Sequence, residues 1–240
     1  MPTAPAAVPP RTCMDSLIAF LHHHLRALLA DPAALHATRR RCLALLTPPL
    51  RHRCRDNLSG GGQEEENNDE DDDEAVLAAL HGSIDALLPS SSSVVVDGDG
   101  AAAAAVCLAG VEEALQAPAL LPEHGQTAGL DNRRVAACAY FCLALVRCAQ
   151  GDAWQMAMDL LQAVAVCPAA VAATTARDDG ATTGLVPRAL WEGLFDEGVL
   201  ARAGAGGAGE DDAARRAARR YKDWLMYYKV VAADGAQNGG

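Results

Sequence analysis

The sequence has few aromatic residues and no long apolar run. Phe, Trp and Tyr make up 4% of the 240 residues, although half of the chain is apolar and Ala is abundant. No run of about 18 uncharged apolar residues occurs, so we expect no membrane-spanning helix. The first apolar segment carries His22, His23 and His24 and has no small-residue cleavage pattern, so we expect no secretory signal. These absences predict an intracellular protein of the cytoplasm, the nucleus or both.

Motifs that carry chemistry are also missing. The chain has no G-x-S-x-G, no Walker loop and no H-E-x-x-H. Acidic pairs such as Glu112 and Glu113 are adjacent in sequence, and neighbouring helical side chains diverge, so they do not form an acid/base pair. We therefore expect no catalytic residue, no cofactor and no enzymatic activity in this chain.

The negative charge is concentrated in one segment. The formal net charge is -11, and residues 64–74 hold most of the excess carboxylates, so the rest of the chain is close to neutral. This segment lacks the spacing and the turn glycine of a calcium loop, and we interpret it as a solvated linker. A nucleic-acid-binding protein usually presents a basic surface, so we expect no nucleic-acid partner.

Eight cysteines are spread through segments with helical patterns. Cys138 and Cys142 are four residues apart and share a helix face, which would allow both to bind one metal ion. Zinc sites normally need two more ligands with short paired spacings, and none is visible nearby in the sequence. We therefore expect buried thiols and no metal site.

The sequence predicts an all-α protein, either an irregular helical bundle or a short α-solenoid of about eight helices, without a sheet. A single helical domain is expected over 14–233, between disordered tails at 1–13 and 234–240. Acidic or Gly/Ala-rich composition predicts disordered insertions at about 55–73, 90–100, 169–186 and 203–209. Apolar residues at helical spacing mark the segments 15–30, 32–46, 74–88, 101–116, 132–150, 153–168, 187–200 and 210–231.

The best-defined unit is the helical hairpin over 132–168, whose helices are separated by Gly151 and Asp152. It resembles a tetratricopeptide unit, with Tyr140 at the aromatic position and Pro168 at the closing position. No second copy occurs at the same period, so a generic helical hairpin is the favoured interpretation. Such a hairpin cannot bury both faces alone and needs further helices around it.

The last predicted helix is the densest candidate site. Arginines and aromatic residues together are typical of the centres of protein interfaces. The alternative is that its aromatic residues dock this helix onto the core while its arginines face water. The candidate protein interface consists of Arg216, Arg219, Arg220, Tyr221, Trp224, Tyr227 and Tyr228.

Several segments, taken in order, resemble the N-terminal helical domain of plant ubiquitin-protein ligases of the LIN/CERBERUS type. They are MDSLIAFLHHHL, EAVLAALHGSIDAL, AGLDNRRVAACAYFCLALVRCAQGDAWQMAMDLLQAV, LWEGLF and, more loosely, RRYKDWLMYYK. In that family this domain precedes a U-box and WD-type repeats, and no residue here matches the U-box. The resemblance implies a non-catalytic interaction or scaffold domain of the ubiquitin pathway. Its expected partners are full-length ligases of the family or a second copy of the chain. The alternative is a fragment of an active U-box ligase.

Overall fold

The computed structural model describes residues 11–48, 67–88, 100–172, 174–175, 182–204 and 209–237. Helices dominate this part of the chain, which confirms the all-α prediction. No helix in these ranges is long and apolar enough to cross a membrane. The long helices are α1 (Arg11–Ala30), α2 (Pro32–Leu45), α3 (Asn67–Leu87), α4 (Gly100–Ala119), α5 (Asn132–Gln150), α6 (Ala153–Val166) and α10 (Glu210–Gln237). The short helices are α7 (Pro168–Val171), α8 (Arg188–Leu194) and α9 (Glu197–Gly204).

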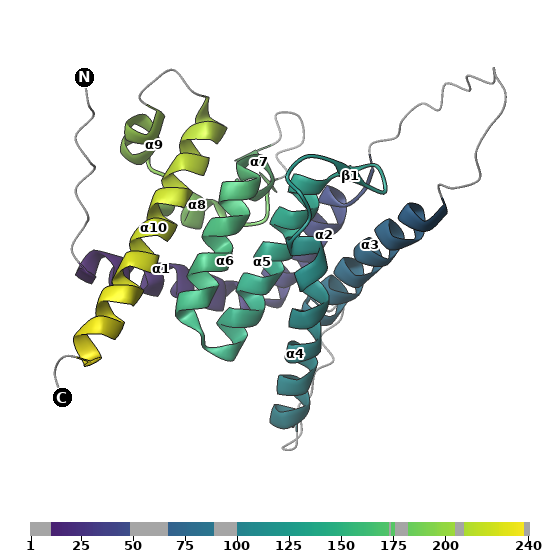
Figure 1. The fold of residues 1–240 in the computed structure, drawn as a ribbon, viewed down its shortest axis with the longest axis horizontal. Coiled ribbons are helices and arrows are strands. Elements are labelled where there is room, and N and C mark those ends of the chain that lie inside the picture. The colour runs from purple at the N-terminus through teal and green to yellow at the C-terminus, as the bar shows by residue number, and fades with distance from the viewer. Residues whose placement is uncertain are drawn as a thin grey trace.

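Helices α10, α6, α5, α4 and α3 pack in that order, each against the next, so that α10 and α3 lie at opposite ends of one layer (Figure 1). Helices α1 and α2 cross behind this layer and contact α5, and α1 also contacts α6 and α10. Helix α9 packs against α10. The buried apolar residues form one continuous core, in which Leu21, Leu80 and Phe141 are among the largest fully buried side chains.

The hairpin of α5 and α6 has the bounds that its capping residues predict. Asp131 and Asp152 each cap a helix, because their carboxylates accept a backbone hydrogen bond from the first turn at 2.9 Å. Gly151 ends α5 with a φ of 83°, in the left-handed region that favours glycine. These local signals explain why the predicted bounds of α5, 132–150, agree with the structure.

The prediction that no sheet forms was wrong in detail. Strands β1 (Gln126–Thr127) and β2 (Leu130–Asp131) pair antiparallel, with Thr127 opposite Leu130. Ala128 and Gly129 between them have φ values of 48° and 79°, as a two-residue turn that matches strand twist requires. A second ladder joins β3 (Thr174–Thr175) to β4 (Thr182–Thr183). Both are short hairpins beside the helices.

The acidic segment differs from the prediction. Residues 67–73, expected to be disordered, form the first turns of α3. Carboxylates are favourable near a helix N-terminus, where they interact with the helix dipole, and this effect offsets their mutual repulsion. The Asp73 carboxylate also accepts a hydrogen bond from the Ala128 amide at 3.0 Å, so it holds the β1–β2 turn. The remainder of the predicted insertion, 55–66, lies outside the described residues.

The other expected insertions also contain structure. Within 169–186, α7 and the β3–β4 ladder form, and Leu185 and Val186 are fully buried. The segment 187–200 divides into α8 and α9, because the Asp196 carboxylate accepts a hydrogen bond from the Val199 amide and so starts a new helix. Ala203 is buried at the end of α9.

The remaining boundary predictions concern the tails and two insertions. Helix α1 begins before residue 14, and α10 continues through 237, so parts of both predicted disordered tails are helical. Helix α4 begins at 100, the last residue of the insertion predicted at 90–100. Residues 90–99, 205–208 and 238–240 lie outside the described residues, as do residues 1–10.

Candidate functional site

One face of α10 docks this helix onto the rest of the molecule. Ala217 and Leu225 are buried, and Tyr221, Trp224 and Tyr228 are half-buried on the same side. The Tyr221 hydroxyl donates a hydrogen bond to the Leu194 carbonyl of α8 at 3.4 Å. These contacts agree with the alternative that the aromatic stripe fixes α10 to the core.

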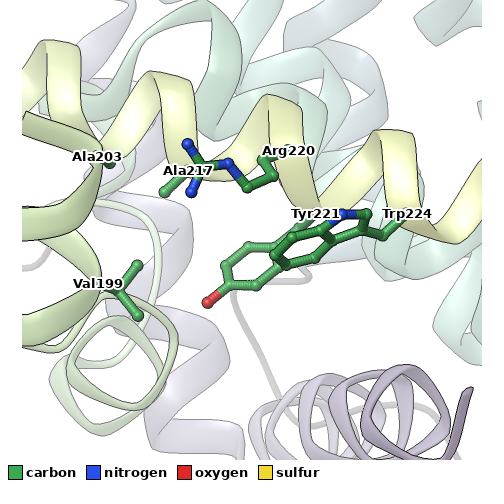
Figure 2. Close-up of a pocket in the computed structure, with 6 residues that line it drawn as sticks. All are labelled: Val199, Ala203, Ala217, Arg220, Tyr221 and Trp224. Atoms are coloured by element: carbon green, nitrogen blue, oxygen red, sulfur yellow. The ribbon is translucent and has the colours of Figure 1, made fainter. Parts of the chain in front are cut away.

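The docking face leaves a small cavity between α9 and α10 (Figure 2). Its volume is about 50 Å³, and Tyr221 and Trp224 project into this region from α10, with the Tyr221 hydroxyl toward the side of Val199. The two rings meet edge to face with centroids 5.7 Å apart. A space this small holds at most water, because small-molecule sites generally enclose roughly 300 Å³ or more.

The C-terminal half of α10 packs against α6 and α1 through a different contact. The Lys229 ammonium lies 3.5 Å from the centroid of the Trp154 ring, a cation–π contact. Tyr228 and Lys229 line a cavity of about 230 Å³ together with Trp154 and Arg11. Tyr228 therefore faces this second cavity and not the one lined by Tyr221.

The outward face of α10 carries arginines in its first half and apolar side chains in its second half. Met226, Tyr227, Val230 and Val231 are between 46% and 56% exposed. Residues at these spacings lie on one side of a helix, and Arg216 and Arg219 fall on the same side two to three turns earlier. Arg219 is 3.9 Å from Glu123, but both side chains are more than half exposed, so water screens this pair.

The candidate residues therefore fall into separate groups. Arg220, Tyr221 and Trp224 meet at the cavity beside α9. Tyr227, Arg216 and Arg219 belong to the outward face, and the Arg216 Nε also donates to the Ala203 carbonyl at 2.7 Å. Sequence reasoning did not select Met226, Val230 and Val231, although their spacing relative to the half-buried aromatic residues places them on the exposed side.

A polar network joins α4, α5 and α6. The Arg147 guanidinium pairs with Glu112 at 2.7 Å, and its Nε lies 4.0 Å from Asp159, too far for a hydrogen bond. The Gln155 amide donates to the Asp159 carboxylate at 2.9 Å. The Asp159 side chain is 11% exposed. Among the described residues this is the one close hydrogen bond of Asp159, and a buried carboxylate with so few partners is costly to ionise.

Burial has opposite effects on the acid and the base of this region. It raises the pKa of Asp159 to about 6, and the Gln155 hydrogen bond, Arg147 and Lys222 offset this only in part. Burial lowers the pKa of Lys222 on α10, an effect that Asp159 partly offsets. The Lys222 ammonium also donates a hydrogen bond to Gln162. Burial and the Asp159 charge raise the pKa of Tyr140.

The structure brings a third thiol to Cys138 and Cys142. Cys42 of α2 joins these two α5 residues, all three are fully buried, and their sulfur atoms lie within 4.8 Å of one another. Hydrogen bonds from the neighbouring thiols, followed by burial, raise the pKa of Cys138. The sequence offered no signal for Cys42, because the contact depends on how α2 crosses α5.

No protein-family model, no curated protein and no solved structure matches the chain.

Proposed function

We propose that the chain is a non-catalytic protein-interaction module and that the outward face of α10 is its docking surface. The observation that carries the proposal is the exposure of Met226, Tyr227, Val230 and Val231 on a helix whose opposite face packs against the rest of the molecule. Clustered exposed apolar side chains with a polar border are typical of protein interaction sites.

The chemistry of this face defines the partner. The apolar half of the face fits the apolar stripe of an amphipathic helix. Arg216 and Arg219, in the first half of α10, fit carboxylates at one end of that stripe. Aromatic and Arg side chains are the residue types that dominate binding energy in such interfaces, and this face carries Tyr227 in its apolar half and Arg216 and Arg219 in the other half. We therefore expect a partner helix with an apolar half and an acidic half.

The test compares two sets of exposed apolar side chains. The double variant Met226→Ser/Val230→Ser removes the apolar half of the surface, whereas Leu120→Ser removes an apolar side chain that is 72% exposed after the end of α4. The free energy of unfolding of both variants should lie within about 0.5 kcal/mol of the wild-type value, because substitutions of exposed residues change stability little. Partners captured from plant tissue by the wild type should be retained by Leu120→Ser and lost by the double variant.

If the chain binds its partners through another surface, the double variant will still capture them, and this result would contradict the proposal. A synthetic helix from each captured protein then identifies the direct partner. Titration of that helix should give a Kd at least tenfold weaker for Arg219→Gln, since the variant removes a charge contact to the acidic half. Sedimentation of the chain alone tests whether a second copy occupies the surface.

The family resemblance supports a place in the ubiquitin pathway. We propose that full-length ligases of the LIN/CERBERUS type are partners and that the chain does not itself transfer ubiquitin. Incubation with activating and conjugating enzymes should give no ubiquitin chains, and chain formation by the protein alone would contradict the proposal. The alternative, a fragment of an active U-box ligase, requires an in-frame U-box in the transcript beyond residue 240, which transcript sequencing tests.

A further inference from the structure

The cluster of Cys42, Cys138 and Cys142 has the geometry of a ligand set from two separate helices. Cys138 and Cys142 lie one turn apart on α5, and α2 places Cys42 against them. Their sulfur atoms converge to within 4.8 Å although each residue is fully buried among apolar neighbours. Three thiols that converge on one point supply soft ligands, which select thiol-seeking ions.

The separation of the sulfur atoms is close to what a shared ion requires. Sulfur ligands about 2.3 Å from one ion lie roughly 3.8 Å from each other in tetrahedral geometry. The three sulfur atoms would therefore need to approach one another by about 1 Å at most.

Burial and ligand number select the charge of the ion. Among the described residues, no fourth His, Cys, Asp or Glu joins the three sulfur atoms. Zinc would then lack the fourth ligand it normally takes. Three thiolates leave a net charge of about -1 with a divalent ion and about -2 with a monovalent ion, and buried net charge is costly. A trivalent ion gives a neutral complex.

We propose that Cys42, Cys138 and Cys142 bind one trivalent, thiol-seeking ion of the arsenite class as a three-coordinate complex. Arsenous acid, As(OH)₃, reacts with three thiols to form As(S–Cys)₃ and three molecules of water. Each thiol proton leaves with one hydroxide, three As–O bonds are replaced by three As–S bonds, and the oxidation state of arsenic does not change. The site is independent of the docking surface on α10.

Thr38 supports this assignment. It lies one turn before Cys42 on the same side of α2, is 1% exposed, and its hydroxyl has no hydrogen-bond partner in the described part of the chain. A buried hydroxyl without a partner is rare and calls for an explanation. A metal-bound sulfur is a hydrogen-bond acceptor of the kind that this hydroxyl lacks in the described structure, and outer contacts of this kind stabilise bound ions.

The three thiols are fully buried, so an ion reaches them only when the surrounding helices open locally. The α2 helix is tied to α3 by the Arg39–Asp85 ion pair at 2.7 Å, with Asp85 more than half exposed. Arsenite should therefore bind the folded chain slowly, and Arg39→Gln should speed binding without changing its stoichiometry.

The test uses the reduced full chain and sodium arsenite. Native mass spectrometry should show one added arsenic with the loss of three hydrogens, and the melting temperature should rise. Changes of residues around a ligand set weaken metal binding by up to roughly 100-fold. Cys42→Ala removes a ligand and should weaken arsenite binding by more than this, whereas Thr38→Val should weaken it by roughly tenfold. The control is Cys148→Ala, which removes a buried thiol of the same α5 helix and should bind like the wild type.

A second measurement does not depend on folding of the variants. Arsenite should protect Cys42, Cys138 and Cys142 of the wild type from alkylation, while Cys148 and the exposed Cys107 gain no protection. The proposal is overturned by equal protection of Cys148, by an adduct that loses only two hydrogens, or by zinc binding to the wild type where arsenite does not bind.

Discussion

The Asp159→Asn variant should be more stable than the wild type at neutral pH. Asp159 is buried on α6, with Gln155 as its close hydrogen-bond donor and Arg147 at 4.0 Å. Asparagine has nearly the same shape and keeps an oxygen that can accept the Gln155 hydrogen bond. Arg147 keeps its closer partner, Glu112, at 2.7 Å. The substitution therefore removes a buried charge and retains most of the packing.

The pKa of Asp159 gives the size and the sign of the effect. Its value of about 6 in the folded chain lies above its ordinary value of 3.8, so the protonated form is favoured by folding. The difference between these two pKa values corresponds to about 3 kcal/mol of folding free energy. This contribution is fully present below about pH 4, is lost as the pH rises towards 6, and is absent at pH 7. The neutral variant does not lose it.

Urea denaturation of both proteins between pH 4 and pH 7.5 measures this difference. The free energy of unfolding of Asp159→Asn minus that of the wild type should rise by about 2.4 kcal/mol between pH 4 and pH 7, because part of the roughly 3 kcal/mol is already lost at pH 4. Asp223→Asn, which changes an exposed carboxylate of α10, is the control and should show a difference within about 0.5 kcal/mol at every pH. A variant that is destabilised equally at every pH would refute the reasoning, because Asp159 would then be ionised and well paired.

Three further predictions concern local structure. Gly151→Ala should cost about 1 kcal/mol through backbone strain alone, since its φ is 83° and an added Cβ meets nothing within 4 Å. Gly110→Ala, inside α4, should stabilise the fold by about 0.5–1 kcal/mol. Thermal denaturation should therefore show a lower melting temperature for the first variant and a higher one for the second. Asp131→Ala should cost about 1 kcal/mol in urea denaturation, because α5 loses its cap, and an unchanged midpoint would exclude that cap. Tyr221→Ala should cost about 2–3 kcal/mol, while Tyr221→Phe should stay within about 1 kcal/mol, because it keeps the packed ring and the hydrogen bond to Leu194 is long, at 3.4 Å.

The parts of the fold that were predictable from sequence are those with local causes. The Asp131 and Asp152 caps and Gly151 fix the α5–α6 hairpin within a few neighbouring residues. The same holds for the Asp31 cap of α2, which precedes a proline in the first turn. The half-buried aromatic stripe of α10 was also predictable, because its residues repeat every three or four positions.

The missed features depend on contacts between distant segments or on opposing local effects. Repulsion among the carboxylates of 67–73 predicts a loop, but these residues form the first turns of α3, where the helix dipole favours negative charge. Its Asp73 bonds to Ala128 across 55 residues. The proximity of Cys42 to Cys138 follows from the crossing of two helices. No local pattern in either segment contains that information, so the candidate ion site was not visible from sequence.

The two ends of the helical layer differ in a way that favours α10 as the interaction end. Stacked helical units need a polar outer face at each end, because an apolar end helix recruits another layer. At one end, the first turns of α3 present carboxylates such as the exposed Asp72 and Glu74. At the other end, α9 packs beside the first half of α10, around Ala217 and Tyr221. The second half of α10 presents apolar side chains to water, so it is the end at which a further helix would bury apolar surface.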